Sequence, residues 1–145
     1  MAEPRATAGI ITIERTLAAP PEVVYAAWTT PASMAVWLTP VGHAEVDADV
    51  RVGGAFTITM VGDGRRIEHS GEYLELVPPH LLRFTWRSPY TGPEPGVVTV
   101  ELRPAPGGTA LRLTHASLPS EAVDGHRGGW GSMLERLGAE LAESI

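Results

Sequence analysis

The amino-acid sequence predicts an α+β domain, in which a curved antiparallel sheet of about seven strands wraps around one long C-terminal helix. Short runs with apolar and polar residues in alternation dominate the chain, and tight turns join most of them, which favours antiparallel pairing. Two short helical segments follow the first run, and an amphipathic helix from about residue 130 to residue 144 closes the chain. Such a sheet must either fill the space beneath the helix with side chains or leave a cavity.

The N-terminal part is predicted to form one strand and two short helices. Residues 10–17 alternate and are rich in β-branched side chains, as strands are. Pro21 suits the first turn of a helix, and Trp28 lies on the apolar side of that helix. Thr30 and Pro31 then form a second helix start, with Thr30 as the N-cap.

Six more strands are expected before the last helix. Gly-Gly and Pro-Pro pairs separate several of them, and Gly71, inside the third, indicates a bend or bulge. These strands are predicted at residues 43–50, 55–60, 67–77, 81–87, 97–102 and 109–115.

Glycines are frequent where the last helix should begin. Since each glycine inside a helix costs about 1 kcal/mol relative to alanine, they indicate a late or broken helix start. The alternative is that they provide close packing, or room for a ligand at the mouth of a cavity. These glycines are Gly125, Gly128, Gly129 and Gly131.

The composition sets the number of domains and excludes several kinds of chemistry. At 145 residues the chain fits one domain, which we place at residues 10–145 behind a disordered or extended tail at residues 1–9. Without cysteine there is no thiol nucleophile and no cysteine-ligated zinc. Without lysine there is no Schiff-base chemistry and no P-loop.

Charge and hydropathy limit the expected partners. The net charge is −6 and the arginines are scattered, so we expect no nucleic-acid partner. Apolar runs stay short of the roughly 18 residues that a membrane span needs, and the first residues do not resemble a secretory signal. The expectation is therefore a cytoplasmic protein without membrane insertion, and homodimerisation stays open.

Five groups of motifs, in order along the chain, resemble those of a known family. The chain is similar to the SRPBCC, or START-like, superfamily, and within it to the Aha-type subgroup, named for homology to the activator of a heat-shock-protein ATPase. The similarity spans about residues 10 to 142. The motifs are Val24-Tyr-Ala-Ala-Trp28-Thr-Thr-Pro31 with Trp37-Leu-Thr-Pro40; Arg51-Val-Gly53-Gly54-Ala-Phe56; Gly71-Glu-Tyr73-Leu-Glu-Leu-Val-Pro78-Pro79 with Leu82-Arg-Phe84-Thr-Trp86; Gly107-Gly108-Thr109-Ala-Leu-Arg-Leu-Thr114-His115; and Gly129-Trp130 with Leu134 and Leu137.

This resemblance implies the helix-grip fold, with a hydrophobic cavity between the sheet and the C-terminal helix. It implies no single activity, because the superfamily includes lipid carriers, hormone receptors, polyketide cyclases, hydroxylase subunits and a co-chaperone domain. Small bacterial members of the subgroup mostly lack a known role.

One strand carries four potential metal ligands on the same face, namely His43, Glu45, Asp47 and Asp49. The rise of about 3.3 Å per residue spreads them over more than about 15 Å, so they cannot converge on one ion. We therefore expect a solvated face, no metal site and no cofactor.

Three polar residues are candidates for a role inside the cavity. His115 lies two and four residues from Leu113 and Leu111, on the same face of the strand, and is expected on the helix-facing side. There it would orient a ligand or act as acid or base, or it would be a buried neutral histidine bonded to the backbone or to a threonine such as Thr99. His69 and Tyr73 lie on the same strand face if no bulge separates them. They would then either bind a ligand or form a pair of side chains on the sheet, at the surface or in the core.

The sequence thus predicts a binding protein for a small apolar or aromatic ligand, held between the sheet and the last helix. One alternative is a cyclase- or dehydratase-type enzyme that uses His115, although no catalytic constellation is readable. A second is a protein-interaction module that modulates a chaperone ATPase. Large aromatic and apolar side chains would line the cavity or fill the core. The predicted ligand-binding residues are Trp37, Phe56, Ile58, Met60, His69, Tyr73, Phe84, Trp86, His115, Trp130, Met133 and Leu134.

Overall fold

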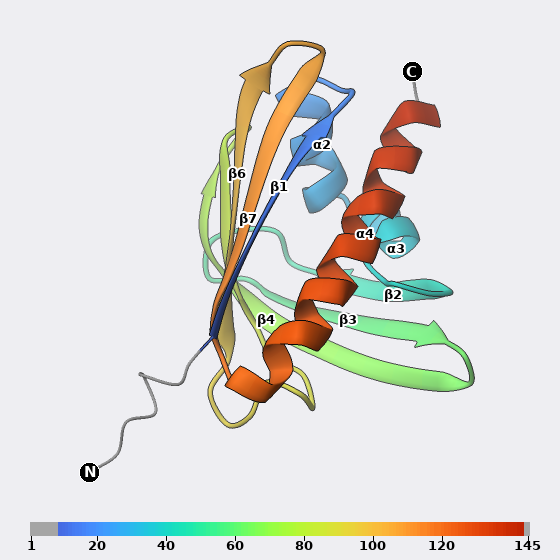
Figure 1. The fold of residues 1–145 in the computed structure, drawn as a ribbon, viewed down its shortest axis with the longest axis vertical. Coiled ribbons are helices and arrows are strands. Elements are labelled where there is room, and N and C mark those ends of the chain that lie inside the picture. The colour runs from blue at the N-terminus through green and yellow to red at the C-terminus, as the bar shows by residue number, and fades with distance from the viewer. Residues whose placement is uncertain (1–8, 144–145) are drawn as a thin grey trace.

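A curved seven-stranded antiparallel sheet with a long helix across its concave face forms the protein (Figure 1). The computed structural model describes residues 9–143. The strand order is β1-β7-β6-β5-β4-β3-β2, which confirms the predicted fold class. The elements are β1 (Gly9–Leu17), α2 (Pro21–Thr29), α3 (Pro31–Trp37), β2 (His43–Ala48), β3 (Ala55–Gly62), β4 (Arg65–Val77), β5 (Leu81–Trp86), β6 (Gly96–Ala105), β7 (Gly108–Leu118), the short 3-10 helix η1 (Ser120–Ala122) and α4 (Val123–Glu143).

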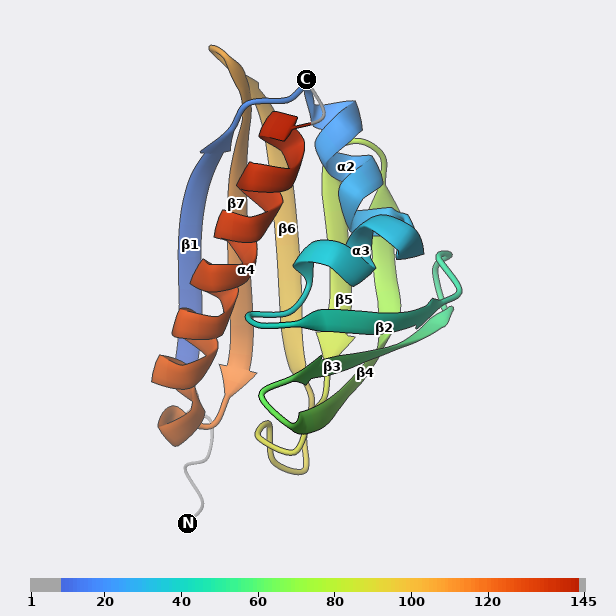
Figure 2. The same cartoon turned by 90° about the vertical axis from the view of Figure 1, so that its right-hand side faces the viewer.

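All three α-helices lie on the same side of the sheet (Figure 2). Helix α4 runs along β1 and β7, and the shorter α2 and α3 lie beside it over the middle strands. The two short helices begin at their prolines, as predicted, with Pro20 and Thr30 at the N-cap positions. Among the described residues, no helix is both long enough and apolar enough to cross a membrane.

The last helix begins at Val123, seven residues before the predicted start, so the interpretation of the glycines as a late or broken start is wrong. Pro119 ends β7, and η1 then leads directly into α4. The unfavourable helix propensity of glycine is overridden by packing, because one face of α4 is anchored in the core. The buried side chains of this face are Trp130, Met133, Leu134, Leu137 and Leu141.

The β3–β4 hairpin and the long strand β4 shape one end of the sheet. Asp63 and Gly64 form its two-residue turn, and both have positive φ, as tight hairpin turns require. Strand β4 pairs with β3 up to Glu72 and with β5 from Tyr73 onward. Gly71 lies at this transition, where a Cβ would overlap the Thr85 carbonyl oxygen. The predicted bulge does not fall at Gly71, because the pairing with β3 is regular there and the register shift lies between Tyr73 and Glu75, in the pairing with β5.

Two of the predicted boundaries fall at the limits of the described residues. The predicted tail at residues 1–9 lies outside them, except for Gly9, which is the first residue of β1. The predicted end of the last helix at residue 144 also lies outside them.

Candidate functional site

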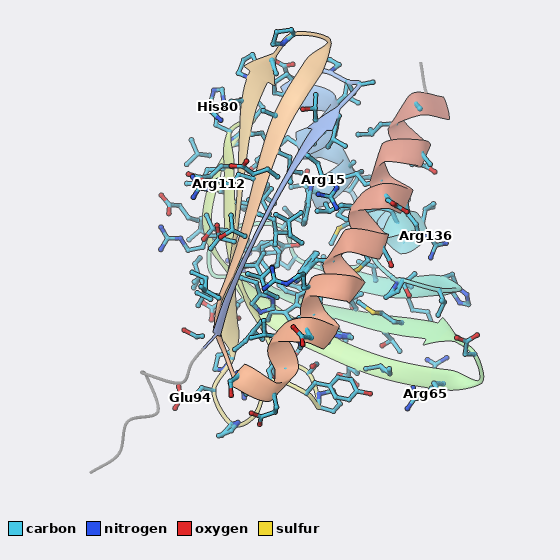
Figure 3. The ribbon with its side chains drawn as sticks, in the orientation of Figure 1. Arg15, Arg65, His80, Glu94, Arg112 and Arg136 are labelled. Atoms are coloured by element: carbon cyan, nitrogen blue, oxygen red, sulfur yellow. The ribbon has the colours of Figure 1, made fainter. Side chains whose placement is uncertain are left out.

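A cleft of about 690 Å³ opens between the N-terminal half of α4 and the β3–β4 hairpin. The α3–β2 connection at residues 39–41, the end of β5, and the loop after β5 complete its walls. Figure 1 shows these segments around the lower half of α4, and Figure 3 shows Arg65 at the hairpin tip. The volume is within the range of small-molecule sites in proteins, about 300–1,000 Å³.

Two tryptophans give the cleft an aromatic wall. Trp86 at the end of β5 and Trp130 on α4 both line it, with their ring centroids 5.1 Å apart and their planes at 47°. The His69 ring lies 4.9 Å from the Trp86 ring and lines the cleft as well. Both tryptophans are almost completely buried, so the core holds these rings in place, and only a small part of each ring is accessible from the cleft.

Glycines on α4 provide the space on the helix side. Gly125 and Gly129 both line the cleft, and they lie four residues apart on one helix face. A Cβ at Gly125 would meet nothing within 4 Å, and one at Gly129 would meet only Pro40 at 4.0 Å. The second interpretation of the glycine run, room at the cavity mouth, agrees with this geometry.

Arg136 on α4 holds the α3–β2 connection in place. Its guanidinium donates hydrogen bonds to the Thr39 carbonyl at 2.7 Å and to the Gly42 carbonyl at 2.9 Å. The segment between these two carbonyls forms one rim of the cleft. Because hydrogen bonds from a charged donor are among the stronger ones, Arg136 fixes the position of this rim relative to α4.

His115 on β7 lies beneath the cleft and does not line it. Its side chain is fully buried, and its Nδ1 accepts a 2.9 Å hydrogen bond from Trp130 Nε1. Nδ1 is therefore unprotonated and Nε2 carries the hydrogen in the neutral ring. Burial, and secondarily the nearby His126, lowers the pKa of His115 to about 3. The residue is a buried neutral histidine, and its partner is Trp130 rather than the backbone or Thr99.

His69 is also buried and neutral at pH 7. Burial is the main cause that lowers its pKa to about 4; His126 acts in the same direction, and backbone groups of Ile67 and Ile58 offset part of the effect. Its Nδ1 is buried and has no hydrogen-bond partner among the described residues. His69 therefore contributes a polar but uncharged surface to the cleft.

His126, which the sequence analysis did not single out, is the third histidine of the site. It lines the cleft, it is half-buried, and its ring lies 5.2 Å from that of His115 at 87°. Its Nδ1 lies 2.9 Å from the Ala122 carbonyl oxygen. The signal for His126 was present, since it lies four residues before Trp130 and shares its helix face. It was missed because the predicted helix began only at about residue 130, so His126 was not assigned to a helix face.

The predicted ligand-binding residues divide into two groups. Five of them line the cleft: Met60, His69, Trp86, Trp130 and Met133. The other seven are buried in the core and do not line the cleft: Trp37, Phe56, Ile58, Tyr73, Phe84, His115 and Leu134.

A small void of about 10 Å³ lies among several of these core residues, including Phe56, Tyr73 and Phe84. It is about the size that a single water molecule needs. In the middle of the sheet the space beneath the helices is thus filled by aromatic side chains. Trp28 and Trp37, 4.6 Å apart at an edge-to-face angle of 72°, come from α2 and α3.

The acidic strand face is exposed, as predicted. His43, Glu45, Asp47 and Asp49 all face solvent on and just after β2. Arg66 forms a bidentate pair with Glu45, at 2.7 Å for the shorter contact, and lowers the pKa of this carboxyl.

Comparison with known proteins identifies one family and many structures of the same fold. The family model described as "Activator of Hsp90 ATPase homolog 1-like protein" matches residues 18–142. Protein CV1439 from Chromobacterium violaceum is 33% identical, with a TM-score of 0.80, and the alignment covers 91% of this chain and 96% of that one.

Two further structures extend this comparison. The AHSA1 protein SPO3351 from Silicibacter pomeroyi is 28% identical over 94% of this chain and 100% of that one, with a TM-score of 0.78. CalU16 from Micromonospora echinospora is 29% identical over 91% of this chain and 75% of that one, with a TM-score of 0.72. A search of curated proteins found no match.

Proposed function

We propose that this chain, which belongs to the activator of Hsp90 ATPase homolog 1-like family, binds a small apolar or aromatic molecule in the cleft between α4 and the β3–β4 hairpin. The observation that carries the proposal is the pair of buried tryptophans, Trp86 and Trp130, in one wall of a cleft of ligand size. Apolar ligand surface removed from water there contributes roughly 25 cal/mol per Å² before the costs of binding are subtracted.

Two glycine variants of α4 test this proposal. The probe is N-phenyl-1-naphthylamine, a neutral aromatic fluorophore whose emission rises in apolar surroundings. Gly125→Trp places a large ring in the cleft, because Gly125 lines it and has open space at its Cβ position. Gly128→Trp is the matched control, since this residue also has open space but does not line the cleft.

We expect saturable probe binding to the wild type and to Gly128→Trp. Gly125→Trp should bind at least about tenfold more weakly, which corresponds to about 1.4 kcal/mol. No saturable binding to the wild type, or an equal loss in both variants, would refute the cleft as the binding site. Native mass spectrometry of the chain purified from its own host would then identify a co-purifying ligand directly.

The description of the family favours a second candidate function, the stimulation of a chaperone ATPase. Adding the purified chain to an Hsp90-type chaperone and measuring its ATP hydrolysis tests this function. Stimulation that persists in Gly125→Trp would assign the activity to a surface outside the cleft. An unchanged rate at saturating concentration would exclude this function for the chaperone used.

A further inference from the structure

The most informative polar group of the cleft is the imidazole of His126, because its partner fixes its tautomer. A carbonyl oxygen can only accept a hydrogen bond, so the 2.9 Å contact with the Ala122 carbonyl requires the hydrogen on Nδ1. In the neutral ring Nε2 is then an acceptor with a free lone pair. None of the described residues donates to this Nε2. His126 lines the same cleft as Trp86 and Trp130, so the cleft contains an acceptor whose tautomer is fixed.

The other polar groups of the cleft indicate which kind of donor fits. Its formal charges are Asp63 and Glu121 against Arg65, a surplus of one negative charge, which does not favour an anion. These three side chains are exposed at the rim, where charges contribute little to binding. Deeper in the wall His69 is uncharged at neutral pH. A neutral ligand suits this arrangement better than a carboxylate or a phosphate.

We propose that His126 selects the ligand: the cleft takes a neutral aromatic molecule with a hydroxyl group, a phenol or an enol, whose O–H donates to His126 Nε2 while its ring lies against Trp86 and Trp130. This inference rests on the proposed function and adds the chemical class of the ligand and the residue that recognises it. His126 acts here as a specificity-determining residue, and no bond is formed or broken.

Two probes of nearly the same shape isolate this hydrogen bond. In 2-naphthol the hydroxyl donates, whereas 2-methoxynaphthalene retains the ring and the oxygen but has no donor. Isothermal titration calorimetry should show that the wild type binds 2-naphthol about three- to tenfold more tightly than 2-methoxynaphthalene. This ratio corresponds to the net contribution of one hydrogen bond. In His126→Ala the two affinities should agree within about twofold. His80→Ala, which removes an exposed histidine in the turn between β4 and β5, should keep the preference (Figure 3).

A second measurement on the wild type does not depend on any variant. Adding 2-naphthol, but not its methyl ether, should shift the Nε2 resonance of His126 in nitrogen NMR spectra, because a new donor reaches that atom. Equal affinities in the wild type, a preference that survives in His126→Ala, or tighter binding of 2-naphthoate than of 2-naphthol would each overturn the inference. If N-phenyl-1-naphthylamine binds but the naphthol preference is absent, this inference alone fails. If none of the probes binds, the proposed function fails with it.

Discussion

Acid should destabilise this protein well above the pH at which its carboxylates titrate. The perturbation is a change from pH 7.5 to pH 5. His69 and His115 have folded-state pKa values of about 4 and about 3, whereas an unfolded histidine titrates near 6.5. Below pH 6.5 these two imidazoles therefore bind protons in the unfolded chain, whereas in the folded chain they stay neutral. The free energy of unfolding falls as the pH falls, and the contribution of the neutral rings is fully present only above pH 6.5.

The size of the effect follows from the pH interval. Each proton that only the unfolded state binds costs about 1.4 kcal/mol per pH unit. From pH 6.5 to pH 5 each histidine therefore contributes a loss of about 2 kcal/mol, and the two together about 4 kcal/mol. This is a large fraction of the 5–15 kcal/mol that typically stabilise a domain of this kind.

Urea unfolding at several pH values between 7.5 and 5 measures this loss in the wild type. In His115→Gln and in His69→Gln the loss should be about half as large, whatever the stability of each variant at pH 7.5, because one of the two titrating rings is gone. His80→Gln, which removes an exposed histidine, is the control and should retain the full dependence. A wild type whose stability changes by less than about 1 kcal/mol over this range would refute the assignment of two buried neutral histidines.

Three further predictions concern single contacts. Trp130→Phe leaves the buried Nδ1 of His115 without its donor and should cost about 1–3 kcal/mol in urea unfolding from the hydrogen bond alone; an unchanged stability would mean that the bond is absent. Arg136→Ala should lower the unfolding free energy by about 2 kcal/mol and weaken probe binding through the cleft rim, and Arg136→Lys should restore part of both; unaltered probe binding would separate this rim from the site. Gly71→Ala should cost more than about 2 kcal/mol, because its Cβ would overlap the Thr85 carbonyl, whereas Gly128→Ala in open helix should gain up to about 1 kcal/mol; equal effects in thermal unfolding would contradict the steric argument.

The alternation of residues between the two faces of each strand was enough to predict most of the fold from the sequence. Leu111, Leu113 and His115 alternate with polar residues, and all three are buried on the helix-facing side of β7. The same rule placed His43, Glu45 and their neighbours on an exposed face. The alternation works because a one-residue slip would move a whole apolar set into water.

The position of the cleft could not be predicted in the same way. The alternation tells which face of the sheet a side chain occupies, but not which other side chains cover that face. Phe56 and Phe84 point to the concave side, as expected, and there they pack at 5.6 Å against each other and next to Trp28 from α2. Because α2 and α3 fill the middle of the sheet, the open space is displaced toward the β3–β4 hairpin and the first turns of α4. Only the three-dimensional path of those two helices decides this.

The glycines of α4 connect the stability of the helix with the space beside it. Gly125 and Gly129 lower the intrinsic helix propensity by about 1 kcal/mol each relative to alanine, and they are the positions where any side chain would project into the cleft. Gly128, between them in sequence, is exposed and lies outside the cleft. A helix start weakened in this way depends on Trp130. Its ring packs against Trp86, and its indole N–H donates a hydrogen bond to His115. One tryptophan therefore anchors the helix, orients the buried histidine and forms a wall of the cleft, so a change at Trp130 should alter stability and binding together, whereas a change at Gly128 should alter stability alone.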